Sequence, residues 1–535
     1  MMKSKSFSPK RPTAFIASIV SIDSIASIVS IASIASIVSL LYAVPAAAQE
    51  ATYRYQDATQ LWRLTHNAAG LGLDSTVNRG FALFNGEHRS GDYARVQEGT
   101  QTNLLRFQSE RYENVGRYLH AYGRLDFDYG RTKNRAWADV MRPYNANPFF
   151  SGSAIHGKYD FQDFNFTAAL GTVDFGGWRY GLRLDYNVGD LSRLRDPRPR
   201  LQLLDYRLTP AVTYTKGAHT VGLDASYRRR KEKFIGVKNE QENAVIAYYF
   251  MKGLEDVERV TNGYDGFWRE WVDHRFSGAL TYAYHTPTQH SLLSLSMERG
   301  EEYVYERYKY QPGRYYDYQY GVSLLNRFTE ENVLHQFDLS LNYEQAYADE
   351  YRQQLQQDKD LATGLTSYSY INLFTLKKRY QVETFHADLR YRAHFISQQQ
   401  EQGYAGLHVT LDDTHNKHLL PTSNLSYGGT CLTAEGGLQL GKSLWIDAEG
   451  GGFFSQDASL SLADATTDYA TGVLLPDMDY YKANYWRVRL QLTYEFPLKL
   501  KGTDTHWFVR AYGDYLKTDN QLESKCVGVS VGLFN

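Results

Sequence analysis

Residues 486–496 read Trp-Arg-Val-Arg-Leu-Gln-Leu-Thr-Tyr-Glu-Phe. Every even-numbered position in this run is apolar or aromatic, and every odd-numbered position is charged or polar. Successive side chains of a β-strand point to opposite faces, so a strand here has one apolar and one polar face. Its eleven residues also match the ~9–11 that a tilted strand needs to cross a bilayer. The stretch therefore predicts a membrane-crossing strand.

The same alternation recurs along the chain. It is strongest at 117–130, 177–189, 334–347 and 381–395. Weaker copies lie at 159–171, 204–216, 219–229, 274–285, 290–306, 315–327, 404–411, 430–440, 443–455, 505–516 and 525–534. With 481–496 these make sixteen spans. The predicted fold is an all-β, transmembrane, antiparallel up-and-down β-barrel of about 16 strands, with 14 and 18 as the alternatives.

The connections between these spans alternate in length. Tight turns are expected at 171–177, 216–218, 286–289, 329–332, 396–401 and 441–443, and longer loops at 132–158, 190–203, 230–273, 348–380, 412–429 and 456–480. Outer-membrane barrels have short periplasmic turns and long external loops. A soluble sandwich has no reason to alternate in this way, so loop length independently favours a membrane barrel.

The first 48 residues are expected to form a signal peptide. A basic start with Lys3 and Arg11 precedes an apolar stretch, and small residues precede a cleavage site near Ala48. The stretch is longer than the usual core of ~7–15 residues, which leaves an uncleaved membrane helix as the alternative. Residues 49–113 are expected to supply extra strands or a plug in the lumen, and residues 114–535 the barrel. The expected location is the outer membrane of a Gram-negative cell.

Composition excludes several other classes of protein. Removing residues 1–48 moves the formal net charge from −2 to −5, which gives no basic excess for nucleic acid. A mean hydropathy of −0.50 excludes a helical membrane bundle but suits a barrel, in which only alternate residues meet lipid. The 44 Tyr, 26 Phe and 8 Trp suit the aromatic girdles of a barrel, although an aromatic-rich soluble β-protein would share them.

The polar faces of the predicted strands carry charges of both signs. We expect these residues to line the lumen: Arg124, Asp126, Arg183, Asp185, Asp388, Arg390, Arg392, Arg487, Arg489 and Glu495. They either line a water-filled path or pair with one another in a closed interior. Because a barrel of sixteen strands leaves room for water, we favour a conduit for small polar or amphipathic solutes.

The alternative function is a non-transporting surface-binding or scaffold barrel that partners another outer-membrane protein. A TonB-dependent receptor or a surface lipoprotein is a candidate partner. TonB-dependent import by this chain alone is not expected, since such receptors have about 22 strands and a folded plug.

Other groups of residues give weaker indications. Arg228, Arg229, Arg230 and Lys231 leave the membrane toward the exterior and are candidates for contact with lipopolysaccharide phosphates, or are simply a solvated strand end. His415 and His418 lie near Asp412 and Asp413 in a predicted loop, but solvated loops gather such residues by chance, so no metal or cofactor is expected. Cys431 and Cys526 are expected to stay unpaired because their strands lie too far apart. No compact catalytic cluster is found, so no enzymatic activity is expected.

Three segments carry a resemblance to a known family. Residues 61–71 (Leu-Trp-Arg-Leu-Thr-His-Asn-Ala-Ala-Gly-Leu), 91–99 and 123–129 are similar to motifs of a family of Bacteroidota outer-membrane barrels catalogued as a domain of unknown function. The resemblance implies a fold and a location but no activity. Residues 67–71 also resemble the Asn-Pro-Ala motif of long-chain fatty-acid transporters, with Ala68 in place of the proline. That likeness implies a plug in the lumen.

Overall fold

The computed structural model describes residues 49–74, 78–144, 146–238, 240, 246–261, 267–360, 362–500 and 503–534. The chain divides into two units, Met1–Val44 and Pro45–Asn535, and everything below concerns the second.

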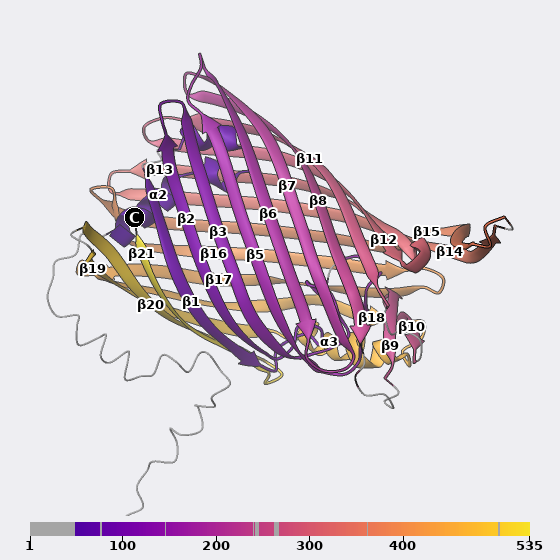
Figure 1. Cartoon of the computed structure of the whole chain (residues 1–535). Helices are drawn as coiled ribbons and strands as arrows, with labels where there is room; N and C mark the ends of the chain where they lie inside the picture. The colour runs from indigo at the N-terminus through magenta and orange to yellow at the C-terminus, as the bar shows by residue number, and fades with distance from the viewer. Residues whose placement is uncertain are drawn as a thin grey trace, which may run out of the picture. The chain divides into compact units, whose positions relative to one another are not determined.

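The described chain forms one closed barrel of eighteen antiparallel strands, together with a separate sheet of three strands (Figure 1). Each barrel strand pairs with its neighbours in sequence, and β1 pairs with β21 from Phe81 opposite Phe534 to Gly91 opposite Ser524, which closes the ring. Closure leaves no barrel edge with unpaired backbone groups, as a strand-built membrane protein requires. The barrel strands are β1 (Arg79–Gly91), β2 (Gln101–Val115), β3 (Leu119–Arg135), β5 (Gly157–Thr172), β6 (Trp178–Arg193), β7 (Arg198–Lys216), β8 (His219–Lys238), β11 (Arg269–His285), β12 (Gln289–Glu306), β13 (Gly313–Glu330), β14 (Val333–Lys359), β15 (Thr366–Ser397), β16 (Gln400–His418), β17 (Ser423–Leu440), β18 (Leu444–Ser461), β19 (Tyr485–Leu500), β20 (Thr503–Thr518) and β21 (Glu523–Phe534).

The predicted all-β, closed antiparallel barrel is confirmed, but the favoured count of about 16 strands is too low and the alternative of 18 is the one observed. All sixteen predicted spans fall on strands, and the two additional strands are β1 and β2. The barrel therefore begins at Arg79 rather than at residue 114. β1 escapes periodicity analysis because its outward positions include Gly86 and His88, which weaken the apolar stripe.

The outer face of the barrel is apolar at mid-strand. On β19, Trp486, Val488 and Leu490 are each 48–49% exposed and point outward, whereas Thr493 and Glu495 are buried on the inner face. The same division appears on β6, where Tyr180 and Leu182 are exposed and Arg183 faces inward onto Asp185. An apolar outer band around a polar interior is the arrangement of barrels that sit in lipid. Among the described helices, none is long and apolar enough to cross a membrane.

The segment before β1 occupies the short-turn end of the barrel. It comprises α2 (Gln49–Thr59), η2 (Trp62–Leu64) and η3 (Ala68–Gly72). η3 packs so closely on β5 and β6 that a Cβ at Gly171 would meet Ala68 O at 2.5 Å, and one at Gly181 would meet Ala69 N at 2.1 Å. We call residues 49–74 the plug. Residues 49–74 thus form short helices, and residues 79–115 form the two strands β1 and β2 with their connection.

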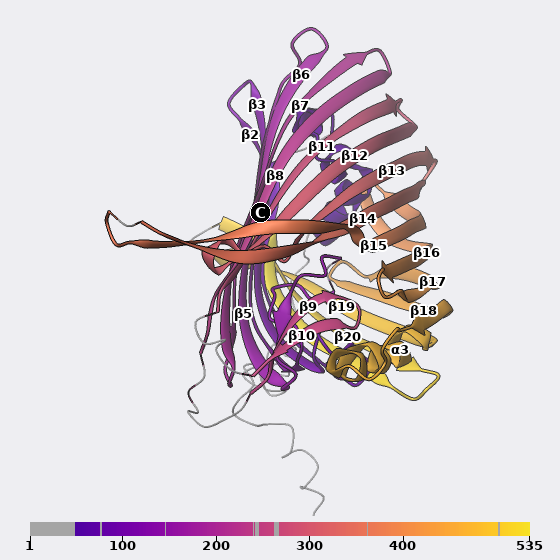
Figure 2. The same ribbon diagram turned by 90° about the vertical axis from the view of Figure 1, so that its right-hand side faces the viewer.

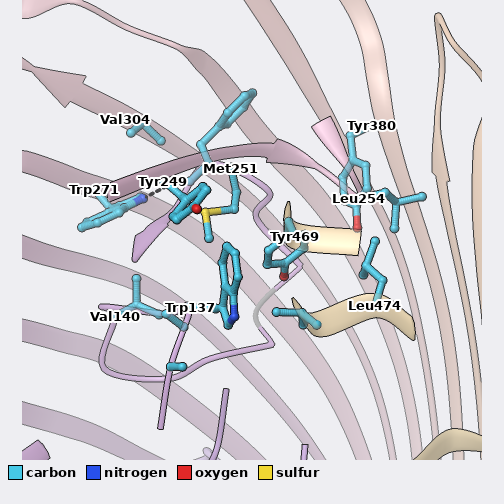
Figure 3. Close-up of a cluster of buried hydrophobic side chains, with 14 of the residues drawn as sticks. Trp137, Val140, Tyr249, Met251, Leu254, Trp271, Val304, Tyr380, Tyr469 and Leu474 are labelled. Carbon is cyan, nitrogen blue, oxygen red and sulfur yellow. Dashed lines mark hydrogen bonds between the residues drawn. The ribbon is translucent and has the colours of Figure 1, made fainter. Parts of the chain in front are cut away.

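Connections at the opposite end fold over the barrel mouth. They carry β4 (Ser151–Gly152), β9 (Tyr248–Gly253), β10 (Asp256–Val260), η5 (Ala470–Leu474) and α3 (Leu475–Lys482). Their side chains meet those of the strand ends in one buried apolar cluster, in which Trp137, Met251 and Tyr469 lie together (Figure 3). We call residues 136–156, 246–260 and 462–484 the lid.

The connection expected at 348–380 is not an irregular loop. β14 and β15 run on beyond the other strands as a two-stranded hairpin that projects from the barrel (Figure 2). The ladder continues to Lys359 opposite Thr366 because backbone pairing does not require the apolar alternation that ends at the membrane boundary. A single turn of 3-10 helix, η4 (Arg307–Lys309), lies between β12 and β13.

Candidate functional site: a chamber between plug and lid

Three cavities lie along the inner wall and share lining residues. Their volumes are about 960, 720 and 400 Å³. Arg489 lines all three, and Glu449 lines the second and third. We call the three together the chamber. Each cavity is within the ~300–1,000 Å³ that is usual for small-molecule sites.

Six aromatic rings line the middle cavity on its lid side, and we call them the aromatic roof. Tyr480 and Tyr481 come from α3, and Tyr93 comes from the loop after β1. Tyr93 stacks on Tyr480 with 4.4 Å between ring centroids, and Tyr427 stacks on Tyr481 at 4.0 Å. The remaining two members, which stack on each other, are Phe453 and Tyr485.

The strand side of the chamber carries ion pairs. Arg392 donates from Nε and Nη2 to the two carboxylate oxygens of Glu435, both at 2.7 Å. Arg390 lies 3.5 Å from the same carboxylate. Arg487 donates to Asp514 from Nε at 2.7 Å. Paired charges of this kind hold their side chains in fixed positions along the wall.

Two charged residues that line the chamber, Arg489 and Glu449, do not form ion pairs of this kind with any described residue. Arg489 lies directly across from Glu449 on β18 and Asp514 on β20, but Asp514 is already engaged by Arg487. In the described part of the chain, Arg489 forms no ion pair or hydrogen bond, and its guanidinium contacts only the ring of Tyr512, 5.5 Å from the centroid. Glu449 likewise accepts no hydrogen bond from any described residue, although its charge interacts with that of Arg487. Both groups are therefore available to a ligand.

The plug is fixed to the wall by charged groups. Arg54 donates to Asp447 Oδ1 at 2.7 Å and to Oδ2 at 2.8 Å, and from Nε to Glu50 at 2.8 Å. Its guanidinium also stacks over Trp445, 4.4 Å from the centroid. At the start of α2, the backbone N–H groups of Gln49 and Glu50 donate to the buried carboxylate of Glu495.

Asp74 holds the plug's own fold together. Its carboxylate accepts hydrogen bonds from the backbone N–H groups of Leu61, Trp62 and Arg63 at 2.9–3.1 Å. Burial raises the pKa of Asp74 to about 6, although these three donors act in the opposite direction.

The lid is held by a second buried carboxylate. Asp477 on α3 accepts from the backbone N–H of Val96 at 2.9 Å and from Tyr144 Oη at 2.5 Å. Burial raises the pKa of Asp477 to about 6. One carboxylate thus joins three connections: the loop after β1, the 136–156 segment and α3.

A further cavity of about 540 Å³ lies beneath the lid, and it corrects one prediction. Arg228 and Arg230 line this cavity and pair with Asp205 and Glu232 inside the barrel. They therefore do not contact lipopolysaccharide, because strand alternation turns them inward. Arg229 and Lys231 occupy the opposite face, where Lys231 lies 3.0 Å from Glu270.

The remaining residues predicted to line the lumen lie outside the chamber. Arg124 pairs with Asp126, and Arg183 pairs with Asp185 while also donating to Thr65 O in the plug. Asp388 accepts from His408 Nε2 at 2.6 Å. Each of these groups thus has a partner within the barrel or plug.

The other candidate sites can also be placed. His415 lies on β16, next to Asp413, and His418 is buried at the end of that strand. Among the described residues, no three potential metal ligands cluster. Cys431 and Cys526 are both free.

Sequence reasoning missed the aromatic roof, the lid and Glu449. Glu449 sits in a run containing Gly450, Gly451 and Gly452, which obscures the alternation. Roof residues such as Tyr93 and Tyr480 lie outside the barrel strands, so no strand period marks them. In the sequence, only the high tyrosine content pointed to the aromatic roof.

Comparisons with known proteins give a family. The model of a family described as Family of unknown function (DUF6850) matches residues 68–535. No curated protein matches the sequence. Among solved structures, the FrpB iron transporter from Neisseria meningitidis is similar with a TM-score of 0.38 and 9% identity, covering 88% of this chain and 83% of that one. The outer membrane protein opdK from Pseudomonas aeruginosa gives a TM-score of 0.34 and 9% identity, covering 86% and 99%.

Proposed function

The chain belongs to this family of unknown function, and we propose that it is a gated conduit for small polar or amphipathic solutes in the Gram-negative outer membrane. The observation that carries the proposal is the polar chamber that lies between the plug and the lid. A barrel of 16–18 strands is wide enough to hold an aqueous channel, so residues that fill its two ends act as closures.

The two ends of the barrel differ in the length of their connections, and this difference indicates which end would face the periplasm. The plug lies at the short-turn end, which would face the periplasm, and the lid lies at the long-loop end, which would face outside. Both closures are segments outside the barrel ladder that meet the wall or a neighbouring loop through side-chain contacts, such as Arg54 with Asp447 and Asp477 with Val96. Segments held in this way can undock without disturbing the barrel ladder.

A second candidate function is a scaffold that binds a partner at the cell surface. The projecting hairpin favours it, because Leu365, Leu373 and Phe374 are 55–71% exposed there. A TonB-dependent receptor or a surface lipoprotein would be such a partner. Arg229 and Lys231 remain candidates for contact with lipopolysaccharide phosphates.

A flux measurement separates the two functions. Mature protein reconstituted in liposomes is expected to pass arabinose or glycine slowly, and a variant lacking residues 49–74 is expected to pass them at least ten times faster. The Arg124→Gln variant, altered on the inner wall outside the chamber, is the matched control. Absence of flux from wild type, from the plug deletion and from a plug deletion in which residues 467–481 are also replaced by a Gly-Ser linker, with all three folded in the bilayer, would favour the scaffold.

A further inference from the structure

We propose that the chamber binds an uncharged pyranose oligosaccharide, with Arg489 and Glu449 hydrogen-bonding its hydroxyl groups and the aromatic roof stacking on its ring faces. This inference rests on the proposed function and names the class of solute that the conduit selects.

The first argument is that Arg489 and Glu449 have no hydrogen-bond partner among the described residues. Arg489 has only donors and Glu449 has only acceptors, and the two lie on adjacent strands in direct register. A ligand that satisfies both must accept a hydrogen bond at one point and donate one nearby. Neighbouring sugar hydroxyl groups do both. Phosphate would satisfy Arg489 alone, and a metal cation would satisfy Glu449 alone.

The second argument is the overall balance of charge. Eleven arginines and ten carboxylates line the chamber. Nearly equal numbers create no strong preference for a ligand of either sign. The walls instead offer a dense set of donors and acceptors, which suits a polyhydroxylated neutral molecule.

The third argument is the aromatic roof, which separates a sugar from an amino acid. A zwitterion could pair its carboxylate with Arg489 and its ammonium with Glu449. It would gain little from six aromatic rings above the site. A pyranose ring has an apolar face of C–H groups that packs on an aromatic face, while its edge carries the hydroxyl groups.

Calorimetry on the full mature chain tests the inference. The protein is kept in an amine-oxide detergent, because maltoside headgroups would compete for the site. Maltohexaose, cellohexaose and xylohexaose are titrated as probes, with sorbitol, glutamine, sodium phosphate and calcium chloride as competitors of other chemistry. At least one hexasaccharide is expected to bind, and sorbitol, which lacks a ring face, is expected to bind at least ten times more weakly.

Substitutions assign that binding to the chamber. Arg489→Gln, Glu449→Gln and Tyr480→Leu are each expected to weaken it about tenfold, and Arg124→Gln is expected to leave it unchanged. Binding of none of the three oligosaccharides, preferential binding of glutamine, phosphate or calcium, or equal affinity in Arg489→Gln would overturn the inference.

The liposome assay separates this result from the proposed function. Flux without oligosaccharide binding refutes the sugar class and leaves the conduit standing. Oligosaccharide binding by the wild type, without flux even in the variant that lacks residues 49–74 and has residues 467–481 replaced by a Gly-Ser linker, refutes the conduit and leaves the site standing.

Discussion

Arg54 links the plug to the barrel wall through a two-pronged ion pair with Asp447, so its removal should loosen the plug at the periplasmic end. The Arg54→Met variant keeps the aliphatic bulk over Trp445 but removes both hydrogen bonds to Asp447 and the one to Glu50. Arg54 and Asp447 are only 18% and 11% exposed, so the carboxylates lose their partner in a poorly solvated place.

The expected cost can be worked from these contacts. Breaking a buried ion pair from one side costs ~3–5 kcal/mol, and the partial exposure of this pair points to the lower end. About 3 kcal/mol corresponds to a ~100-fold rise in the fraction of undocked plug. Because Asp447 loses the positive charge that its carboxylate is bonded to, the double variant Arg54→Met with Asp447→Asn should recover part of that loss.

Hydrogen exchange of residues 49–74 in the reconstituted protein measures this fraction. Amides of α2 should exchange about 100 times faster in Arg54→Met, while those of β19 should exchange at the wild-type rate. Unchanged exchange in α2 would refute the assignment of Arg54 as the anchor. An increase of the exchange rate in β19 as large as that in α2 would show that the substitution unfolds the wall instead of releasing the plug.

Three further predictions follow from other contacts. Leu490→Arg places a charge on the outer face and should lower the free energy of unfolding in lipid, measured by urea titration, by ~2–4 kcal/mol. Gln491→Arg faces the lumen and should lower it by less than about 1 kcal/mol. Equal losses in the two variants would contradict the assignment of Leu490 to the outer face and Gln491 to the inner face. The raised pKa of Asp74 means that the docked plug holds this proton more tightly than the free segment. The contribution of Asp74 to plug docking should therefore weaken by up to about 3 kcal/mol as pH rises from about 4 to about 6, and Asp74→Asn should remove that part of the pH dependence in hydrogen exchange. Mass spectrometry of the exported chain should give Gln49 as its first residue, whose backbone nitrogen lies 2.9 Å from Glu495 Oε1; a start at residue 50 or later would remove that contact and contradict the prediction.

The barrel could be predicted from the sequence because its rule is local. Lipid outside and water inside require apolar and polar side chains to alternate along each strand, so runs such as 486–496 can be recognised as strands from the sequence alone. β1 and β2 fail this test because positions such as Gly86 and Arg111 interrupt the apolar stripe. Two aromatic residues of these strands, Phe84 on β1 and Phe107 on β2, meet only across the strand pair.

The chamber could be predicted only in part, because its contents depend on long-range contacts. Arg487 and Arg489 follow from strand alternation, and both line the chamber. That Arg487 is paired and Arg489 is free depends on Asp514, which lies on a different strand. The lid depends on connections far apart in sequence, since Asp477 meets Val96 across 381 residues. No local pattern encodes such a contact.

Planar-bilayer conductance of four proteins tests the gated conduit most directly: the mature chain, a variant lacking residues 49–74, a variant with residues 467–481 replaced by a Gly-Ser linker, and the combination of both. If plug and lid close one water-filled path in series, the combined variant conducts continuously, and each single variant shows only brief openings. Silence of the combined variant, inserted and folded, would mean that no aqueous path runs through this barrel.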